Sequence, residues 1–189
     1  MMKIPIGELG GSNVLAKALS GRTMLHRLLA MTEVEPVKPE PVFLDFADVD
    51  VATSSFLREC VVGYRDAVRH RRSNLYAVVS NPNDAVEEEL NDLLRERGEA
   101  MLVCNLTAKG HVRELRLLGE LDPKHRQTFD FVEQSGGTDA ASLIREHGAA
   151  EGVTRTAWNN RLATLAALGL VIEESQGRAK RYLPVLKEN

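Results

Sequence analysis

Between residues 42 and 106, apolar segments of strand length alternate with segments of helical periodicity, and this alternation constrains the fold most strongly. The runs at 42–46, 74–80 and 99–107 are short and mostly apolar, as is typical of buried strands. The segment 53–71 carries apolar residues near a 3.6-residue period, and the segment 84–98 ends in a glycine, so both are typical of helices. Strands and helices that alternate in this way predict an α/β fold with a largely parallel or mixed sheet.

Further elements are expected before and after residues 42–106, and a break in the pattern follows them. Residues 2–6 are interpreted as an edge strand, because Pro5 is tolerated only at an edge or a bulge, and residues 20–32 are interpreted as a helix capped by Ser20. The segment 107–118 is compatible with either a strand or a helix. Gly119 and the Asp122–Pro123 pair then break the pattern. The chain is therefore predicted to form two domains, residues 1–118 and residues 119–189.

The second domain is predicted to contain three helices followed by a β-hairpin. The first helix covers 124–137, and the second covers 138–148, with Thr138 as its cap and Gly148 as its stop. Thr154 caps the third helix, which ends near Gly169. Two short strands, LVIEES and KRYLPV, flank the turn QGRA and predict the hairpin.

The third helix has one apolar face and one polar face. Trp158, Leu162, Leu165 and Leu168 share the apolar face, which is expected to be buried. The polar face carries Arg155, Thr156, Asn159, Asn160 and Thr164, and the hairpin tip carries Arg178, Lys180 and Arg181. Asparagine pairs bidentately with adenine and arginine with guanine or phosphate, so these residues are candidates for contacts to DNA.

The stretch VTRTAWNNRLATLAALGLVIEESQGRAKRYLPV resembles the recognition helix and wing of bacterial winged helix-turn-helix regulators. The resemblance covers residues 124–186, and the loop HGAAEGV is longer than the tight turn usual in that family. It implies a small winged-helix domain that binds double-stranded DNA, with the third helix in the major groove and the hairpin touching the backbone. A patch of about five cations gives only modest affinity per subunit, so specific binding is expected to require a homodimer on a two-fold site.

The stretch VFLDFADVDVATSSFLRECVV resembles the core of the STAS fold of bacterial anti-sigma-factor antagonists, and more closely STAS-like domains of unknown function. Thr53, Ser54, Ser55, Phe56 and Leu57 replace the Asp-Ser-Ser-Gly-Leu of the antagonists. The resemblance implies a sensing or docking role for Thr53, Ser54 and Ser55, and Ser55 matches the serine that a partner kinase phosphorylates. The residues alone predict that Thr53 or Ser54 caps the helix.

Two functions remain open at this point. The polar helix face and the basic wing favour a DNA-binding transcriptional regulator whose STAS-like domain senses a signal or docks a regulatory protein. Residues 122–189, however, carry nine basic and nine acidic residues, so the second domain is not a basic nucleic-acid binder in bulk. This balance favours the alternative, a signalling adaptor that does not bind DNA and whose STAS-like domain docks a kinase-like ATPase or another regulatory protein.

Composition and motifs argue against several other classes. Hydrophobic residues make up 43% and charged residues 27% of the chain, which is typical of a soluble globular protein, and neither an export signal nor an apolar run of bilayer length is present. A cytoplasmic protein with no membrane contact is expected. Cys60 and Cys104 lie in apolar stretches and are expected to be buried and free. No catalytic, phosphate-binding or metal-ligand motif is found, so we expect no enzyme, no cofactor and no metal.

Overall fold

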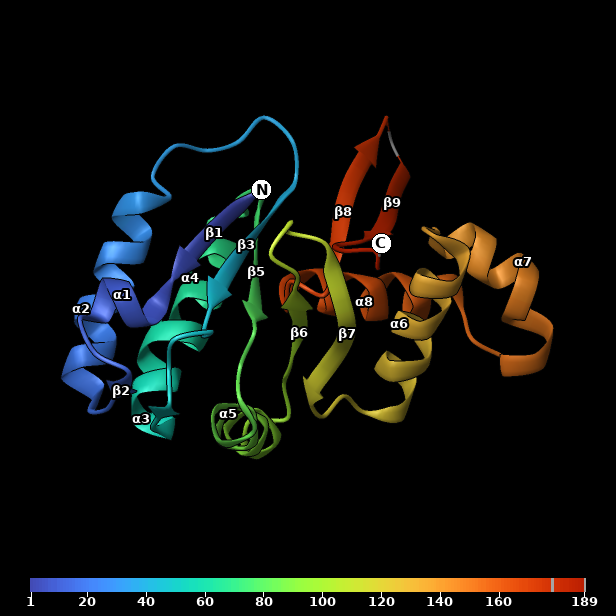
Figure 1. Ribbon diagram of the computed structural model, residues 1–189. Helices are drawn as coiled ribbons and strands as arrows, with labels where there is room; N and C mark the ends of the chain where they lie inside the picture. The colour runs from blue at the N-terminus through green and yellow to red at the C-terminus, as the bar shows by residue number, and fades with distance from the viewer. Residues whose placement is uncertain (178, 189) are drawn as a thin grey trace. The chain divides into compact units, whose positions relative to one another are not determined.

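The computed structural model describes residues 1–177 and 179–188 and divides into two compact units (Figure 1). The first unit comprises Met1–Glu120 together with Leu186–Asn189, and the second comprises Leu121–Val185. Each unit is described by itself below.

The first unit is built on a five-stranded sheet. Its strands are β1 (Met2–Pro5), β3 (Glu40–Asp45), β5 (Leu75–Ser80), β6 (Ala100–Leu106) and β7 (Val112–Gly119). They lie in the order β1-β3-β5-β6-β7; the first four are parallel, and β7 runs antiparallel to β6. The predicted α/β class with a mixed sheet is therefore confirmed, and so is the position of the first strand at an edge.

Helices connect the parallel strands. The predicted helix 53–71 consists of three contiguous helical segments, of which the middle one is π-helical. The helices of this unit are α1 (Ile6–Gly10), α2 (Ala18–Met31), α3 (Ser54–Leu57), η1 (Arg58–Val62), α4 (Gly63–His70) and α5 (Asp84–Glu96), and a small parallel pair is formed by β2 (Val14–Leu15) and β4 (Val51–Ala52). The helix predicted to be capped by Ser20 begins earlier, after Lys17, which has a φ of 73° and makes no side-chain cap bond.

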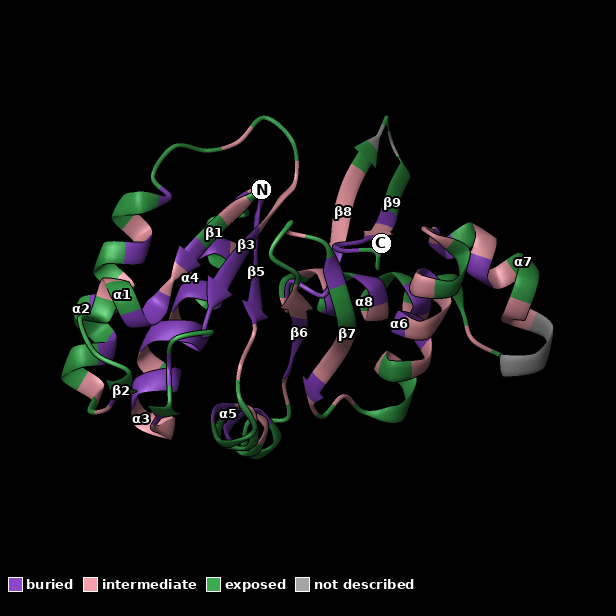
Figure 2. Cartoon of the chain, in the orientation of Figure 1, coloured by how far each residue is buried: buried purple, intermediate pink, exposed green. Residues whose placement is uncertain are grey.

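The core of the first unit follows the period-two pattern of the strands. Val42, Leu44, Ala77, Val79, Met101 and Val103 pack in one buried cluster with apolar residues of α2 to α5. Figure 2 shows β3 and β5 as almost continuously buried. Cys60 and Cys104 are buried and free, as predicted, and burial raises the pKa of Cys60 to about 12 and that of Cys104 to about 11.

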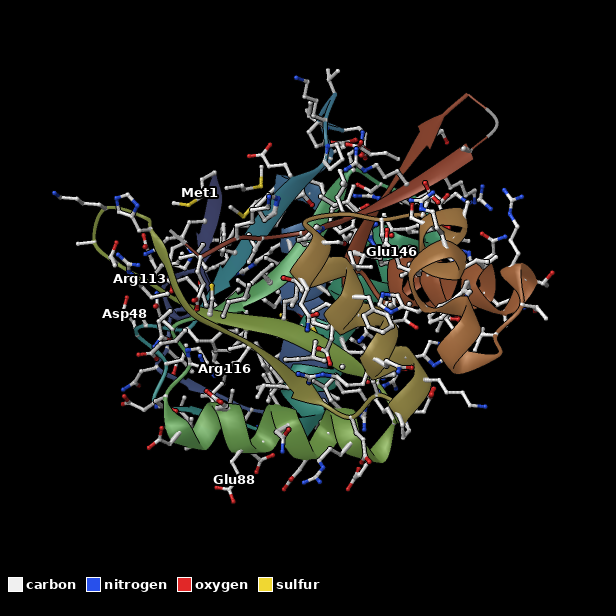
Figure 3. All side chains as sticks on the ribbon, turned by 90° about the vertical axis from the view of Figure 1, so that its right-hand side faces the viewer. Met1, Asp48, Glu88, Arg113, Arg116 and Glu146 are labelled. Carbon is white, nitrogen blue, oxygen red and sulfur yellow. The ribbon has the colours of Figure 1, made fainter. Side chains whose placement is uncertain are left out.

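The segment 107–118, which was ambiguous in sequence, forms a hairpin with β6. The Gly110 N–H donates to the Thr107 carbonyl at 2.8 Å, and β7 follows. Arg116 on β7 donates to Glu87 on α5 at 2.9 Å, whereas Glu88 points away from the sheet (Figure 3). At the outer edge of β7, the Leu115 N–H donates to the Glu188 carboxylate at 2.6 Å. The side chain of Glu188, which follows the second unit in the chain, thus contacts the edge of the first unit's sheet.

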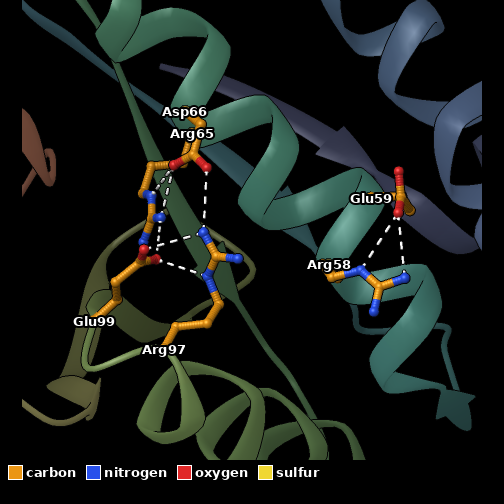
Figure 4. A network of polar contacts seen from close by, with 6 residues as sticks. All are labelled: Arg58, Glu59, Arg65, Asp66, Arg97 and Glu99. Carbon is orange, nitrogen blue, oxygen red and sulfur yellow. Dashed lines mark hydrogen bonds and ion pairs between the residues drawn. The ribbon is translucent and has the colours of Figure 1, made fainter.

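An ion-pair network ties α4 to the start of β6 (Figure 4). The buried guanidinium of Arg65 donates to Asp66 at 2.7 Å and also to Glu99. Arg97 donates to Glu99 at 3.0 Å. The carboxylate of Glu99 therefore joins two arginines, one buried and one partly exposed.

The second unit contains three helices and a hairpin. They are α6 (Pro123–Ser135), α7 (Ala140–Glu151), α8 (Arg155–Ala167), β8 (Val171–Gln176) and β9 (Ala179–Pro184). Thr138 forms an isolated antiparallel bridge with Tyr182, so the segment before α7 pairs with the hairpin at one residue.

Capping residues decide where these helices begin. Thr154 accepts from the Ala157 N–H at 3.3 Å, which confirms it as the cap of α8. The predicted Thr138 cap is wrong: the Asp139 carboxylate accepts from the Ser142 N–H at 2.8 Å, because the Thr138 backbone is engaged in the bridge to Tyr182. The predicted stop at Gly148 is also wrong, since α7 continues to Glu151 and Gly152 supplies the left-handed C-cap with φ of 60°.

Candidate nucleic-acid interface

Helix α8 is anchored by its apolar face. The side chains of Trp158, Leu162 and Leu165 are fully buried, and that of Leu168 is partly buried. The ring of Trp158 lies tilted against that of Phe131 on α6, with centroids 6.1 Å apart. This packing fixes the rotation of α8 about its axis and therefore determines which residues face solvent.

The opposite face of α8 is exposed and polar. Arg155, Thr156, Asn159, Asn160 and Thr164 all lie on it. The Thr164 hydroxyl donates to the Asn160 carbonyl at 3.0 Å, so it is engaged with its own helix. The side chains of Arg155, Asn159 and Asn160 make no hydrogen bond or ion pair within residues 1–177 and 179–188, and they are therefore free to contact a ligand.

These three side chains line a groove in the second unit. The groove has a volume of about 400 Å³, and its walls come from the start of α7, from α8 and from β9. Its lining residues are Asp139, Ala140, Ala141, Arg155, Asn159, Asn160, Ala163, Ala179, Lys180 and Tyr182. Arg155, Asn159 and Ala163 follow one another at intervals of four residues, so they form a single ridge along the helix.

The hairpin divides the basic residues that the sequence grouped together. Side chains alternate along β9, so Lys180 and Tyr182 lie on one face of the hairpin and Arg181 lies on the other. Lys180 lines the groove, whereas Arg181 is exposed and does not. Arg178, the third predicted wing residue, lies outside the described residues.

A glutamate on β8 contacts two of the residues of β9 that line the groove. Glu173 pairs in register with Tyr182 and accepts a hydrogen bond from its hydroxyl at 3.2 Å. The same carboxylate lies 2.8 Å from the Lys180 ammonium. Burial, the charge of Glu173 and this hydrogen bond all raise the pKa of Tyr182, which therefore remains a neutral hydrogen-bond donor near neutral pH.

Six of the groove residues were not foreseen from the sequence, and Asp139, Ala163 and Tyr182 are the informative ones among them. Ala163 could have been found, because it continues the four-residue spacing of Arg155 and Asn159. Tyr182 could also have been found from its period-two relation to Lys180. Asp139 could not, because its place depends on how α7 packs near β9.

The predicted docking residues Thr53, Ser54 and Ser55 belong to the first unit and are partly exposed at the start of α3. Thr53 occupies the cap position, but its hydroxyl makes no cap bond and instead lies 3.2 Å from the Ser55 hydroxyl. The backbone N–H of Ser54 donates to the carboxylate of Glu89 on α5 at 3.0 Å. The anion at this helix start is therefore supplied by a distant residue of the same unit.

This arrangement predicts an order of stability effects at the helix start. Glu89→Ala should lower the free energy of unfolding by about 0.5–1 kcal/mol, because a carboxylate near a helix N-terminus is stabilising. Ser54→Ala should change it by less than about 0.5 kcal/mol, since its side chain supplies no cap bond. Urea unfolding of both variants beside Glu88→Ala, whose side chain points outward, measures the difference. A larger cost for Ser54→Ala than for Glu89→Ala would show that the serine caps the helix.

Comparisons with known proteins leave the chain without an assigned family. No family model matches the sequence, and no curated protein matches it with significant similarity. No group of three or more His, Cys, Asp or Glu residues within residues 1–177 and 179–188 is arranged to hold a metal ion. None of the helices in that part of the chain is long and apolar enough to cross a membrane.

Proposed function

We propose that the chain is a DNA-binding transcriptional regulator whose second unit is a winged helix-turn-helix domain. The observation that carries this proposal is the groove in which the free side chains of Arg155, Asn159 and Asn160 lie on one exposed helix face. Arginine and asparagine are the side chains that read guanine and adenine most often in the major groove. In this proposal α8 enters the major groove, and the β8–β9 hairpin acts as the wing.

The arrangement of helices and strands in the second unit also supports the proposal of a winged-helix domain. Three helices, a hairpin and a single bridge from Thr138 to that hairpin are consistent with the framework in which a winged helix holds its recognition helix. The exposed face of α8 is free of ion pairs to other described residues. The side chains of Arg155, Asn159 and Asn160 therefore lose only water on binding DNA, because none of them has a hydrogen bond or ion pair to another described residue that would have to break.

Charge sets the strength of the proposed contact. The groove has two cationic residues, Arg155 and Lys180, and one anionic residue, Asp139. Few phosphates are neutralised by such a surface, so each subunit binds weakly and counterion release contributes little. Specific binding then requires two copies on a two-fold symmetric site, and we propose a homodimer on DNA.

We propose that the first unit is a STAS-like sensing or docking domain. The stretch 42–62 supports it, since a buried strand there leads into the helix start at Thr53, Ser54 and Ser55. A phosphate added there would face the carboxylate of Glu89, and like charges repel. Regulation at this point would therefore act by separating Glu89 from the helix start.

The balanced charge of the second unit supports one competing function, a signalling adaptor in which both units bind proteins. Incubating the full-length protein with genomic DNA fragments and sequencing the retained fragments separates the two functions. A DNA-binding regulator should enrich a small set of fragments that share a two-fold symmetric sequence. Enrichment no better than with a carrier protein would favour the adaptor.

The two sides of the hairpin predict different effects on DNA affinity. Lys180→Ala should weaken binding to all sequences alike, by about threefold at 0.1 M salt, because a lysine contact to phosphate carries no base information. Arg181→Ala should have a smaller effect, since Arg181 does not line the groove. Fluorescence anisotropy with a selected duplex and a random duplex measures both. A selective loss on one sequence would show that Lys180 reads bases.

A further inference from the structure

We propose that Glu173 weakens DNA binding, because its carboxylate pairs with the Lys180 ammonium in the way that a DNA phosphate would. This inference rests on the proposed DNA-binding function, and it adds a residue that sets the affinity of the same groove for every duplex. The carboxylate of Glu173 contacts two groove-lining side chains, those of Lys180 and Tyr182.

The carboxylate of Glu173 is held from two sides. Its oxygens lie 2.8 Å from the Lys180 ammonium and 3.2 Å from the Tyr182 hydroxyl. Tyr182 is itself immobile, because its side chain is 1% exposed and its backbone exchanges two 2.8 Å hydrogen bonds with Thr138. The hydroxyl of Tyr182 thus fixes the carboxylate next to the lysine, and the pair does not depend on two mobile side chains meeting.

DNA must compete with this contact. For Lys180 to contact a phosphate, its ammonium has to leave Glu173, and the carboxylate then remains as an anion facing the DNA backbone. Both effects oppose binding, and both act on phosphates, which every duplex presents equally. Glu173 therefore weakens binding to selected and random duplexes alike, and the base contacts proposed for Arg155, Asn159 and Asn160 are unaffected.

The neighbouring residue Glu174 provides a matched control. It lies on the same strand, pairs in register with Arg181, and faces the other side of the hairpin. Glu173→Gln and Glu174→Gln remove the same charge with the same change of shape. Any difference between them reports the contact with Lys180 and not the net charge of the protein.

The experiment measures DNA affinity of the full-length protein by fluorescence anisotropy, with a selected duplex and a random duplex, between about 50 and 200 mM salt. Glu173→Gln should bind both duplexes about fivefold more tightly, the upper range for releasing an exposed ion pair. The slope of log affinity against log salt should steepen by about one, because the groove then presents one more net positive charge to the phosphates. Glu174→Gln should gain less than about twofold. Thermal unfolding of each variant checks that the hairpin stays folded.

A second variant tests the role of the lysine. In the Lys180→Ala background, Glu173→Gln should improve affinity by less than about twofold, since no ammonium remains to be released. A full gain in that background, equal effects of the two glutamate variants, or weaker binding of Glu173→Gln would each overturn the inference. If the wild type binds DNA and Glu173→Gln binds identically, only this inference fails. If neither binds any duplex, the DNA-binding function fails with it.

Discussion

Replacing Glu99 by Ala is expected to lower the free energy of unfolding by about 3 kcal/mol, because it leaves a buried arginine with half of its anionic partners. The guanidinium of Arg65 is 3% exposed and donates to Asp66 and Glu99, and its Nη1 atom makes no hydrogen bond to the described residues. With Glu99 absent, Asp66 alone has to balance a charge that water cannot reach. Urea unfolding followed by circular dichroism measures the change.

Glu59→Ala provides the matched control for this prediction. Glu59 also accepts from two arginines, but both of its partners, Arg22 and Arg58, are exposed. Figure 4 shows the pair of Glu59 with Arg58. Water can replace the lost carboxylate there, so the change in stability should be far smaller. Equal costs for the two variants would contradict the idea that the burial of Arg65 makes its network important.

The network also predicts a dependence on pH. Burial acts to raise the pKa of Glu99, but hydrogen bonds from Arg97 and Arg65 outweigh it, and the pKa is lowered overall. A carboxyl group whose pKa is lowered by folding stabilises the protein above its unfolded pKa of about 4.3 and loses that contribution as the pH falls through the folded value. The stability gap between wild type and Glu99→Ala should therefore be constant near neutral pH and close in acid. A gap that persists at the lowest pH at which both variants fold would show that Glu99 acts by packing.

The second large effect concerns recognition. The double variant Asn159→Ala, Asn160→Ala is expected to lose about 1–3 kcal/mol of specific DNA affinity for each base contact removed. Both side chains are exposed and make no hydrogen bond or ion pair to other described residues, so the free energy of unfolding should change little. Binding to a random duplex should also stay unchanged, because non-specific affinity depends on phosphates. Anisotropy with a selected and a random duplex measures the difference.

Thr164→Ala is the control on the same helix. Its hydroxyl is exposed like the two amides, but it donates to the Asn160 carbonyl and has less to offer a base. Its loss should weaken specific binding less than either asparagine variant. Unchanged binding of the double variant to the selected duplex would refute the assignment of the α8 face to base recognition.

The sequence predicted most of the fold where local patterns and burial agree. Strands β3, β5 and β6 are apolar runs because they are buried, and their length excludes helices of the usual size. The errors lie at helix ends. Gly148 was expected to stop α7, yet a glycine within a helix costs only about 1 kcal/mol, which packing of the helix can offset. Thr138 was expected to cap α7, but a long-range bridge to Tyr182 engages its backbone.

The candidate site was predictable to a similar extent. The polar face of α8 follows from helical periodicity, since the buried positions of Trp158, Leu162 and Leu165 determine what is left exposed. Glu89 on α5 accepts from the Ser54 N–H at the start of α3. The two residues lie 35 positions apart in sequence, and no local pattern indicates such a contact. Strand alternation places Lys180 and Arg181 on opposite faces of the hairpin, but which face each one occupies follows only once the register of the hairpin is known.

The edge of β7 has a consequence for how the chain folds as it is synthesised. The Glu188 carboxylate that accepts from the Leu115 N–H belongs to the first unit in space, although the whole second unit precedes it in the chain. A ribosome must therefore translate residues 121–185 before this edge of the sheet can receive its partner. During that interval β7 exposes an unpaired N–H on an edge strand, which is where nascent chains associate with one another. The second unit is thus an insertion in the sequence of the first unit, and it is synthesised before the first unit has its last residues.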